Sequence, residues 1–342
     1  MSATAKTILS VRGLQTMLGP VGAQTAVIDD VRFDLAEGEV LGIVGESGSG
    51  KSITALSIMG LLMPPGKVTA GAVLFDGEDL LRKTPAELSR LRGNQLAMIF
   101  QEPMSALNPL FTVGDQIGES LRIHQGQNRR QARAAAIALL GRVEISQAAR
   151  RVDDYPHQLS GGMRQRVMIA MALACNPRVL IADEPTTALD VTVQAQIFDL
   201  LRTLRREMNL AIILITHDFG VIAQFADRAL VMYAGRIVES ATVRTLFRAP
   251  RHPYTRALME LIPRHDRSAR RPQPIPGSVP QLSEMPPGCR FAPRCVYAEP
   301  ACSDSEPPLE TLASGSEVAC WRHEDVVASV AAASPASQVR LV

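Results

Sequence analysis

An eight-residue glycine-rich segment, Gly45-Glu46-Ser47-Gly48-Ser49-Gly50-Lys51-Ser52, has the residue types and spacing of a loop that binds phosphate. Its glycines let the backbone curl so that successive N–H groups point at phosphate oxygens. Lys51 is placed to reach the β- and γ-phosphates of a nucleotide, and the Ser52 hydroxyl is placed to coordinate Mg²⁺. The segment therefore predicts binding of a nucleoside triphosphate.

Two carboxylates and a histidine follow other apolar runs that predict buried strands. Asp183 and Glu184 follow the run at 179–182, and His217 follows the run at 210–215. Carboxyl ends of parallel strands share one edge of a sheet, so these side chains are expected beside the phosphate-binding loop. Asp183 suits Mg²⁺ through water, and Glu184 is placed to polarise an attacking water. The alternatives are a solvated strand end for the carboxylates and a structural role for His217.

Four of the five cysteines crowd near the C-terminus in the pattern C-x₅-C-x₆-C-x₁₇-C, within a proline-rich segment that follows a polar linker: Cys289, Cys295, Cys302 and Cys320. The pattern lacks the short C-x₂-C spacing common in zinc sites. Four thiolates suit Zn²⁺ or an iron–sulfur cluster, and crowding in a reducing compartment favours metal ligation over disulfides. A cluster, zinc and no metal all remain open from spacing alone.

The elements that must position these residues are readable around them. An apolar run at 40–44 predicts a buried strand before the phosphate-binding loop, and 53–59 predicts a helix after it. Another strand at 96–100 ends in Gln101. Residues 104–165, rich in Ala, Arg and Gln, predict a helical insert. The insert closes at a second glycine-rich turn, Ser160-Gly161-Gly162, which on its own is most simply a helix cap.

Composition narrows the class of protein. The chain has 342 residues, enough for a sizeable core and more than one folding unit. Its formal charge of +2 is too small to favour nucleic acid or an anionic membrane surface. No apolar stretch approaches the roughly 20 residues that span a bilayer, and the start lacks the apolar region of a signal peptide. A cytosolic protein is expected, with any membrane contact made through a partner.

Taken as an ordered set with Ala188-Leu189-Asp190, these motifs resemble the nucleotide-binding subunit of ABC transporters. Within that family the chain resembles the ATPase of oligopeptide and dipeptide importers. The narrower resemblance rests on the cysteine segment and on four phrases: Gln101-Glu102-Pro103-Met104, Leu107-Asn108-Pro109, Tyr155-Pro156-His157-Gln158 and Arg251-His252-Pro253-Tyr254-Thr255. It covers nearly all of residues 8 to 322.

The resemblance implies an α/β fold with a RecA-like P-loop NTPase core and an antiparallel β subdomain. The core would comprise residues 1–103 and 166–262, and the helical subdomain 104–165 would carry the signature turn at its end. An irregular C-terminal cysteine module would follow at 263–325. Residues 326–342 would form a tail, which its Ala, Ser and Val content predicts to fray.

The resemblance also implies a division of roles in ATP hydrolysis. Two subunits would meet head to tail, with each ATP between one phosphate-binding loop and the partner's signature turn. Gln101 would bind Mg²⁺ or the lytic water, Glu184 would be the general base, and His217 would steady the γ-phosphate. Asp190 would link the two sites. The implied ATP-binding set is Gly45, Ser47, Gly48, Ser49, Gly50, Lys51, Ser52, Gln101, Asp183 and His217; Ser52, Gln101 and Asp183 hold Mg²⁺, and the signature set is Ser160, Gly161, Gly162 and Gln165.

The implied partners are a second ATPase subunit, expected to be a paralogue, two transmembrane permeases and an extracytoplasmic substrate-binding protein, with no nucleic acid. The chain would lie on the cytoplasmic face of the inner membrane and energise import of di- and oligopeptides. An importer of a nickel complex, glutathione or a sugar, and a soluble ABC ATPase without a transport role, are the alternatives. For the four cysteines the resemblance implies a [4Fe-4S] cluster, with Zn²⁺ as the alternative.

Two further expectations concern the surroundings of the loop. ABC ATPases usually stack an aromatic residue on adenine, whereas no aromatic residue precedes Phe33 and the matching position holds Met17 or Leu18, which stack more weakly. The phosphate-binding loop and Glu184 are also expected in a core separate from the cysteine module. Substitution of the cysteines should then leave nucleotide binding intact.

Overall fold

The structure is a computed structural model that describes residues 6–20, 22, 24–101, 106–187, 189–262, 275–280 and 284–333. The chain divides into two compact units, and each is described by itself. Unit 1 comprises residues 1–9, 34–39 and 74–215, and unit 2 comprises residues 10–33, 40–73 and 216–342.

Unit 1 contains three parallel strands: β6 (Leu96–Ile99), β7 (Val179–Asp183) and β8 (Ala211–Thr216). They lie in the order β8-β7-β6, and Asp183 is in register with Ile215. Every residue of β7 and β8 is buried. Strands covered on both faces in this way read as continuous apolar runs, which is why the sequence predicted all three.

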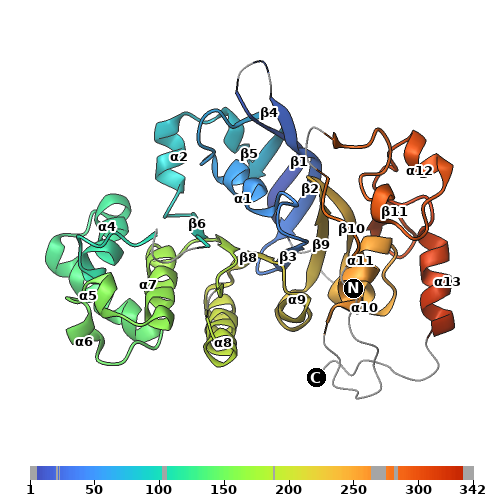
Figure 1. Ribbon diagram of the computed structural model, residues 1–342. Helices are drawn as coiled ribbons and strands as arrows, with labels where there is room; N and C mark the ends of the chain where they lie inside the picture. Colours follow the sequence, from blue (N-terminus) through green and yellow to red (C-terminus); the bar gives the residue numbers. More distant parts are fainter. Residues whose placement is uncertain are drawn as a thin grey trace. The chain divides into compact units, whose positions relative to one another are not determined.

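Residues 104–165, where the sequence predicts a helical insert, contain helices of unit 1, the last of which continues to Leu173 (green in Figure 1). The helices are α4 (Val113–Gln125), α5 (Arg129–Arg142), α6 (Ala148–Arg151) and α7 (Gly161–Leu173). Helices α4, α5 and α7 each begin at a residue whose side chain accepts a hydrogen bond from a backbone N–H group of the first turn. These capping residues are Thr112, Asn128 and Ser160. Such caps satisfy donors that the first helical turn cannot pair internally.

The remaining elements of unit 1 are β5 (Glu78–Asp79), the 3₁₀ helices η1 (Leu80–Arg82) and η2 (Pro156–Gln158), α2 (Pro85–Leu91) and α8 (Val191–Met208). Helix α2 begins at a reciprocal capping box formed by Thr84 and Glu87.

Unit 2 contains a second set of strands, in the order β11-β12-β10-β9-β3. Strand β3 (Val40–Val44) runs parallel to β9 (Arg228–Tyr233), and β9 forms an antiparallel hairpin with β10 (Arg236–Thr242). Two short C-terminal strands, β11 (Glu310–Thr311) and β12 (Glu317–Val318), extend this sheet antiparallel from β10. The sequence did not predict that the C-terminal segment joins the sheet of the phosphate-binding loop.

Three long strands have most of their residues in unit 2: β1 (Thr7–Leu18), β2 (Thr25–Ala36) and β4 (Lys67–Phe75). They are neighbours in the order β2-β1-β4, and β4 pairs antiparallel with β5. Figure 1 shows them as the long blue arrows.

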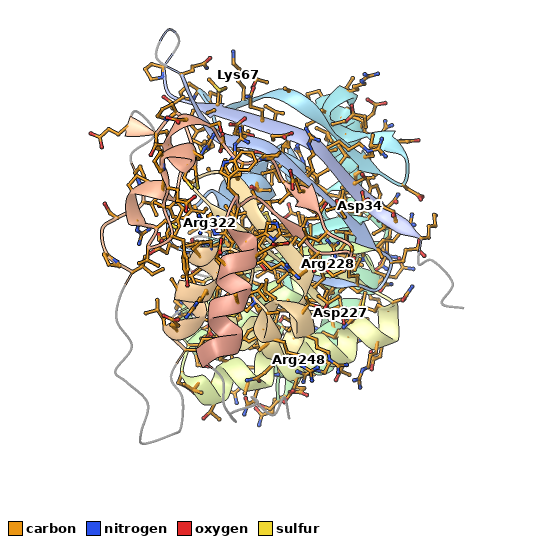
Figure 2. The ribbon with its side chains drawn as sticks, turned by 90° about the vertical axis from the view of Figure 1, so that its right-hand side faces the viewer. Asp34, Lys67, Asp227, Arg228, Arg248 and Arg322 are labelled. Carbon is orange, nitrogen blue, oxygen red and sulfur yellow. The ribbon has the colours of Figure 1, made fainter. Side chains whose placement is uncertain are left out.

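The helices of unit 2 are α1 (Lys51–Met59), α9 (Phe219–Phe225), α10 (Val243–Arg248), α11 (Pro253–Glu260), α12 (Pro300–Asp304), α13 (His323–Ala333) and the 3₁₀ helix η4 (Ala292–Arg294). Helix α13 replaces the start of the tail that was expected to fray. Its Ala- and Val-rich sequence is compatible with a helix, and Glu324 and Asp325 in its first turn face the positive end of the helix dipole. Arg322, labelled in Figure 2 just before this helix, pairs with Asp325 at 2.6 Å. No helix in the described part of the chain is long and apolar enough to cross a membrane.

Candidate active site

The phosphate-binding loop connects β3 to α1 in unit 2 as the sequence predicts, and its glycines are required by its geometry. A Cβ atom at Gly45 would lie 2.1 Å from the carbonyl oxygen of Met232. Gly48 and Gly50 have φ angles of 80° and 103°, which side chains of L-residues rarely adopt. Ser47 and Gly48 are exposed at the tip of the loop. The backbone there is open to a ligand.

Lys51 bridges the loop from inside. Its Nζ atom donates to the carbonyl oxygens of Gly45 at 2.8 Å and Glu46 at 2.9 Å, and the side chain is 6% exposed. Gly50, the residue before α1, has no side chain to cap the helix, and the first turn carries no acidic residue. An ammonium group and the positive end of a helix therefore meet at one place, which suits a phosphate.

Contacts from distant parts of unit 2 hold the loop from outside, and the sequence did not predict them. The Ser49 carbonyl oxygen accepts the Gly235 N–H at 2.8 Å, and the Tyr254 hydroxyl accepts the Glu46 N–H at 2.8 Å. The Glu46 carboxylate forms a two-pronged ion pair with Arg294, which lies between Cys289 and Cys295. The expectation of a cysteine segment separate from the phosphate-binding loop is therefore wrong.

Two predicted catalytic residues lie together in unit 1. The Gln101 side-chain amide donates to Glu184 Oε2 at 3.3 Å, and the Thr187 hydroxyl donates to the same oxygen at 2.9 Å. Glu184 follows β7 with a φ angle of 45°, an unusual conformation that its backbone N–H supports by donating to Ile215 at 2.9 Å. Asp183, the last residue of β7, is 5% exposed. The strand end thus presents one buried and one accessible carboxylate.

His217 belongs to unit 2, where it is exposed in the turn between β8 and α9. The next residue, Asp218, accepts the Gly220 N–H at 2.7 Å and begins α9. The role of His217 at the γ-phosphate stays a prediction. The same holds for adenine contact by Met17 or Leu18, which are half-buried at the end of β1.

The predicted signature turn forms the exposed N-terminus of α7. Ser160 Oγ accepts the Met163 N–H at 3.3 Å, so the turn is also the helix cap that the residues alone suggested. Ser160 and Gly161 are exposed, and the first turn of α7 has no acidic residue. Its leading N–H groups and the positive helix end suit an anion that comes from outside unit 1.

Gln165 and Asp190, which are also assigned to the contact between subunits, differ in how far they are exposed to solvent. Gln165 is only 2% exposed in this chain, whereas Ser160 is exposed, and its contact with a partner's ATP stays a prediction. Five residues along an α-helix correspond to a rotation of about 140°, which turns Gln165 away from the face of its cap. Asp190 is exposed and accepts the Val193 N–H at 2.9 Å, so it caps α8. Neighbouring Ala188 lies outside the described residues.

The four C-terminal cysteines line one small apolar pocket, together with Phe291, Ala292 and others. Burial raises the pKa of the Cys289 thiol to about 11 and that of Cys320 to about 12. Backbone N–H groups of Tyr297 and Arg322 donate to the sulfurs of Cys295 and Cys320, each at 3.3 Å. All five cysteines are free of disulfides. Among the described residues, no group of three or more His, Cys, Asp or Glu side chains is arranged to hold a metal ion.

Comparison with known families assigns the chain to a class. Residues 28–187 match the family described as ABC transporter, which spans the phosphate-binding loop, the signature turn and the β7 carboxylates. Residues 238–302 match the family described as oligopeptide/dipeptide transporter, C-terminal region. The chain belongs to the ABC transporter family and carries the ATPase cassette of that family.

Individual relatives match nearly the whole chain. A peptide import ATP-binding protein of Brucella abortus (strain 2308) is 51% identical over 313 residues, which are 92% of this chain and 94% of the relative. A peptide import ATP-binding protein of Brucella melitensis biotype 1 is 48% identical over 333 residues, which are 94% of this chain and 98% of the relative.

Solved structures agree on the fold. A dimeric ATP-binding cassette in a post-hydrolysis state with ADP and Pi has a TM-score of 0.62 and is 30% identical, covering 69% of this chain and 99% of its own. A protein of Clostridium perfringens that is part of an ABC transporter complex has a TM-score of 0.61 and is 27% identical, covering 70% of this chain and 90% of its own.

Proposed function

We propose that this chain is the ATP-hydrolysing subunit of an importer for di- and oligopeptides. The observation that carries the proposal is the similarity to peptide import ATP-binding proteins, 51% and 48% identical along nearly the full chain. The separate match of residues 238–302 to the C-terminal region of oligopeptide and dipeptide transporters supports the same substrate class.

The phosphate-binding loop is assigned to the β- and γ-phosphates of ATP. Lys51 would exchange part of its bonding to Gly45 and Glu46 for phosphate oxygens, and the N-terminus of α1 would stabilise their charge. Ser52, Gln101 and Asp183 supply the oxygen atoms that Mg²⁺ prefers, so their chemistry fits this ion, which would neutralise phosphate charge when bound.

Glu184 is assigned as the general base of hydrolysis. It would take a proton from a water whose oxygen attacks the γ-phosphorus, while the bond to the β–γ bridging oxygen breaks and ADP leaves. The contacts of its Oε2 with Gln101 and Thr187 support this role, because they hold the carboxylate in place at the end of β7. His217 is assigned to the departing phosphate.

Two ATPase subunits would complete each other's sites. The exposed Ser160 and Gly161 at the N-terminus of α7 support a contact with the γ-phosphate held by the partner, and Asp190 would lie at the same junction. We expect the partner ATPase to be a paralogue and the other components to be two permeases and an extracytoplasmic binding protein. The chain would then work on the cytoplasmic face of the inner membrane.

The four C-terminal cysteines are proposed to hold a [4Fe-4S] cluster as a structural element. They converge on one buried pocket, and N–H groups donate to two of the sulfurs, as is usual around such clusters. Because the pKa values of the Cys289 and Cys320 thiols are raised, binding of the cluster to these thiols must release their protons.

Growth on peptides tests the transport proposal. A strain that requires an amino acid and lacks the gene for this chain should fail to grow when that amino acid is supplied only as a di- or oligopeptide. Wild-type protein should restore growth, and Lys51→Ala should not. If the strain that lacks this chain takes up peptides normally but fails to take up nickel, glutathione or a sugar, the chain serves an importer of that other solute.

A further inference from the structure

Glu46 is the one carboxylate within the phosphate-binding loop, and it is held by Arg294. Arg294 Nη1 lies 2.7 Å from Glu46 Oε2, and Nη2 lies 3.0 Å from Oε1. The Arg294 side chain is 4% exposed, with its guanidinium carbon 5.8 Å from the ring centre of Tyr233 and 5.9 Å from that of Phe291. Its Nε also donates to the Pro276 carbonyl at 2.9 Å. The cation is fixed on every side.

The backbone of Glu46 is held by a neighbouring aromatic group. Its N–H donates to the hydroxyl of Tyr254, which is fully buried. The ring of Tyr254 packs at 4.7 Å from that of Tyr233 and at 5.3 Å from that of Phe291. The same small cluster therefore orients both the guanidinium that meets the Glu46 side chain and the hydroxyl that meets its main chain.

Electrostatics give this arrangement a consequence for nucleotide binding. A carboxylate in an eight-residue loop lies within about one Debye length of any phosphate bound there, so its charge opposes a polyanionic ligand. Lys51 already donates to Gly45 and Glu46 within the loop. The hydrogen bonds and charge of Glu46 raise the pKa of Arg294, so the guanidinium stays charged and cancels the carboxylate throughout the physiological range.

We propose that Arg294 is a positioning residue for ATP binding: it neutralises Glu46 and fixes the first turn of the phosphate-binding loop, so that ATP affinity depends on a residue of the cysteine segment. The inference rests on the proposed phosphate-binding role of residues 45–52. Arg294 directly precedes Cys295 in the stretch that begins at Cys289. Any change that disorders the stretch around Arg294 should therefore lower the affinity of the chain for ATP.

Equilibrium binding of Mg-ATP to the purified full chain tests the proposal, with KM and kcat measured in the assembled transporter. Arg294→Gln should raise Kd and KM about ten- to twentyfold, the effect of one uncompensated charge at about 10 Å in an effective dielectric of about 20, and leave kcat within about twofold. The defect should shrink as salt is added, because salt screens the half-buried carboxylate where it meets solvent. Arg294→Lys should be intermediate, because it keeps the charge and loses the fork.

The decisive variant is the double substitution Glu46→Gln with Arg294→Gln. Removing both charges should restore Kd to within about twofold of wild type. Glu46→Gln alone, at a half-buried position that tolerates the change, should bind ATP no more weakly than wild type. A double variant that binds as weakly as Arg294→Gln would mean that Arg294 only supports local packing, and the proposal would be overturned.

Two controls separate this inference from what it rests on. Arg290→Gln is a control matched in position, because Arg290 lies in the same stretch as Arg294. Arg290 pairs with Asp29 and Glu306 rather than with the phosphate-binding loop. The Kd of this variant for Mg-ATP should stay within about twofold of wild type. An equal loss in Arg290→Gln and Arg294→Gln would overturn the charge mechanism. Lys51→Ala should abolish binding of Mg-ATP. If Lys51→Ala still binds Mg-ATP, the phosphate-binding role of residues 45–52 itself fails. If Lys51→Ala loses binding while Arg294→Gln binds as tightly as wild type, only the inference about Arg294 is refuted.

Discussion

Replacing Glu184 by Gln should stop ATP turnover while leaving the protein folded and able to bind ATP. The change removes the basicity of the side chain and keeps its shape. The amide oxygen of Gln can occupy the position of Oε2 and accept from both Gln101 and Thr187, now at 3.3 and 2.9 Å. Gln also tolerates the φ angle of 45° as well as Glu does.

The expected magnitudes follow from these contacts. Loss of a general base lowers turnover by about 10²- to 10⁴-fold, which corresponds to about 3–5 kcal/mol of barrier. Thermal stability should change by less than about 0.5 kcal/mol, because both hydrogen bonds are retained at a solvent-accessible position. A large kinetic effect without a stability effect distinguishes a catalytic carboxylate from one that only ends a strand.

The assay is steady-state phosphate release by the assembled transporter, with Mg-ATP affinity and the unfolding temperature measured on the purified chain. Glu207→Gln is a matched control, since Glu207 is an exposed carboxylate of α8 that pairs with Arg142, and it should leave turnover unchanged. Turnover of Glu184→Gln within about threefold of wild type would refute the assignment of the base. A shared loss in both variants would point to an unspecific effect of charge.

Other substitutions test the remaining assignments. Ser160→Arg should abolish hydrolysis at the site whose phosphate-binding loop lies on the partner and spare ATP binding by this chain; loss of that binding in the isolated chain would contradict a role between subunits. Tyr254→Phe leaves the Glu46 N–H without its acceptor, so calorimetry should show about 1–3 kcal/mol less stability of unit 2; an unchanged unfolding temperature would count against this contact. Anaerobically purified protein should hold roughly four irons per chain. Cys302→Ser should lose the irons, become sensitive to protease at 275–333 and bind Mg-ATP more weakly. Cys175→Ser, the control, should keep the irons, the protease resistance and the affinity of wild type. Stoichiometric zinc in colourless wild-type protein would exclude the cluster.

Features that depend on a short stretch of chain could be predicted from the sequence. The phosphate-binding loop was recognisable because a strand, three glycines and a helix start lie within twenty residues, and each glycine is required by local geometry. The apolar strands that precede Gln101 and Glu184 were recognisable in the same local way, whereas the contact between the two side chains depends on the pairing of β6 with β7. Periodicity and turn chemistry thus locate the loop, the strands and the residues that follow them.

Features that depend on helix rotation or on distant pairing could not be predicted in the same way. Gln165 was grouped with Ser160 by its place in a phrase, but the rotation of α7 buries it. Helix α13 begins in a stretch whose composition also fits a frayed tail. The pairing of β12 with β10 joins Val318 to Glu239, and no periodicity in either segment records such a partner. Packing decided these outcomes.

Glu46 shows how a motif can leave an energetic requirement unstated. The pattern of a phosphate-binding loop fixes the glycines, the lysine and the hydroxyl, and it accepts any residue at this position. A carboxylate there opposes the ligand, so a compensating cation must come from outside the loop. In this chain it comes from Arg294, 248 positions away, in the stretch between Cys289 and Cys295. Because the proposed binding of phosphate requires Arg294 against Glu46, a nucleotide that binds this arrangement more tightly should in turn stabilise it, as thermodynamic linkage demands.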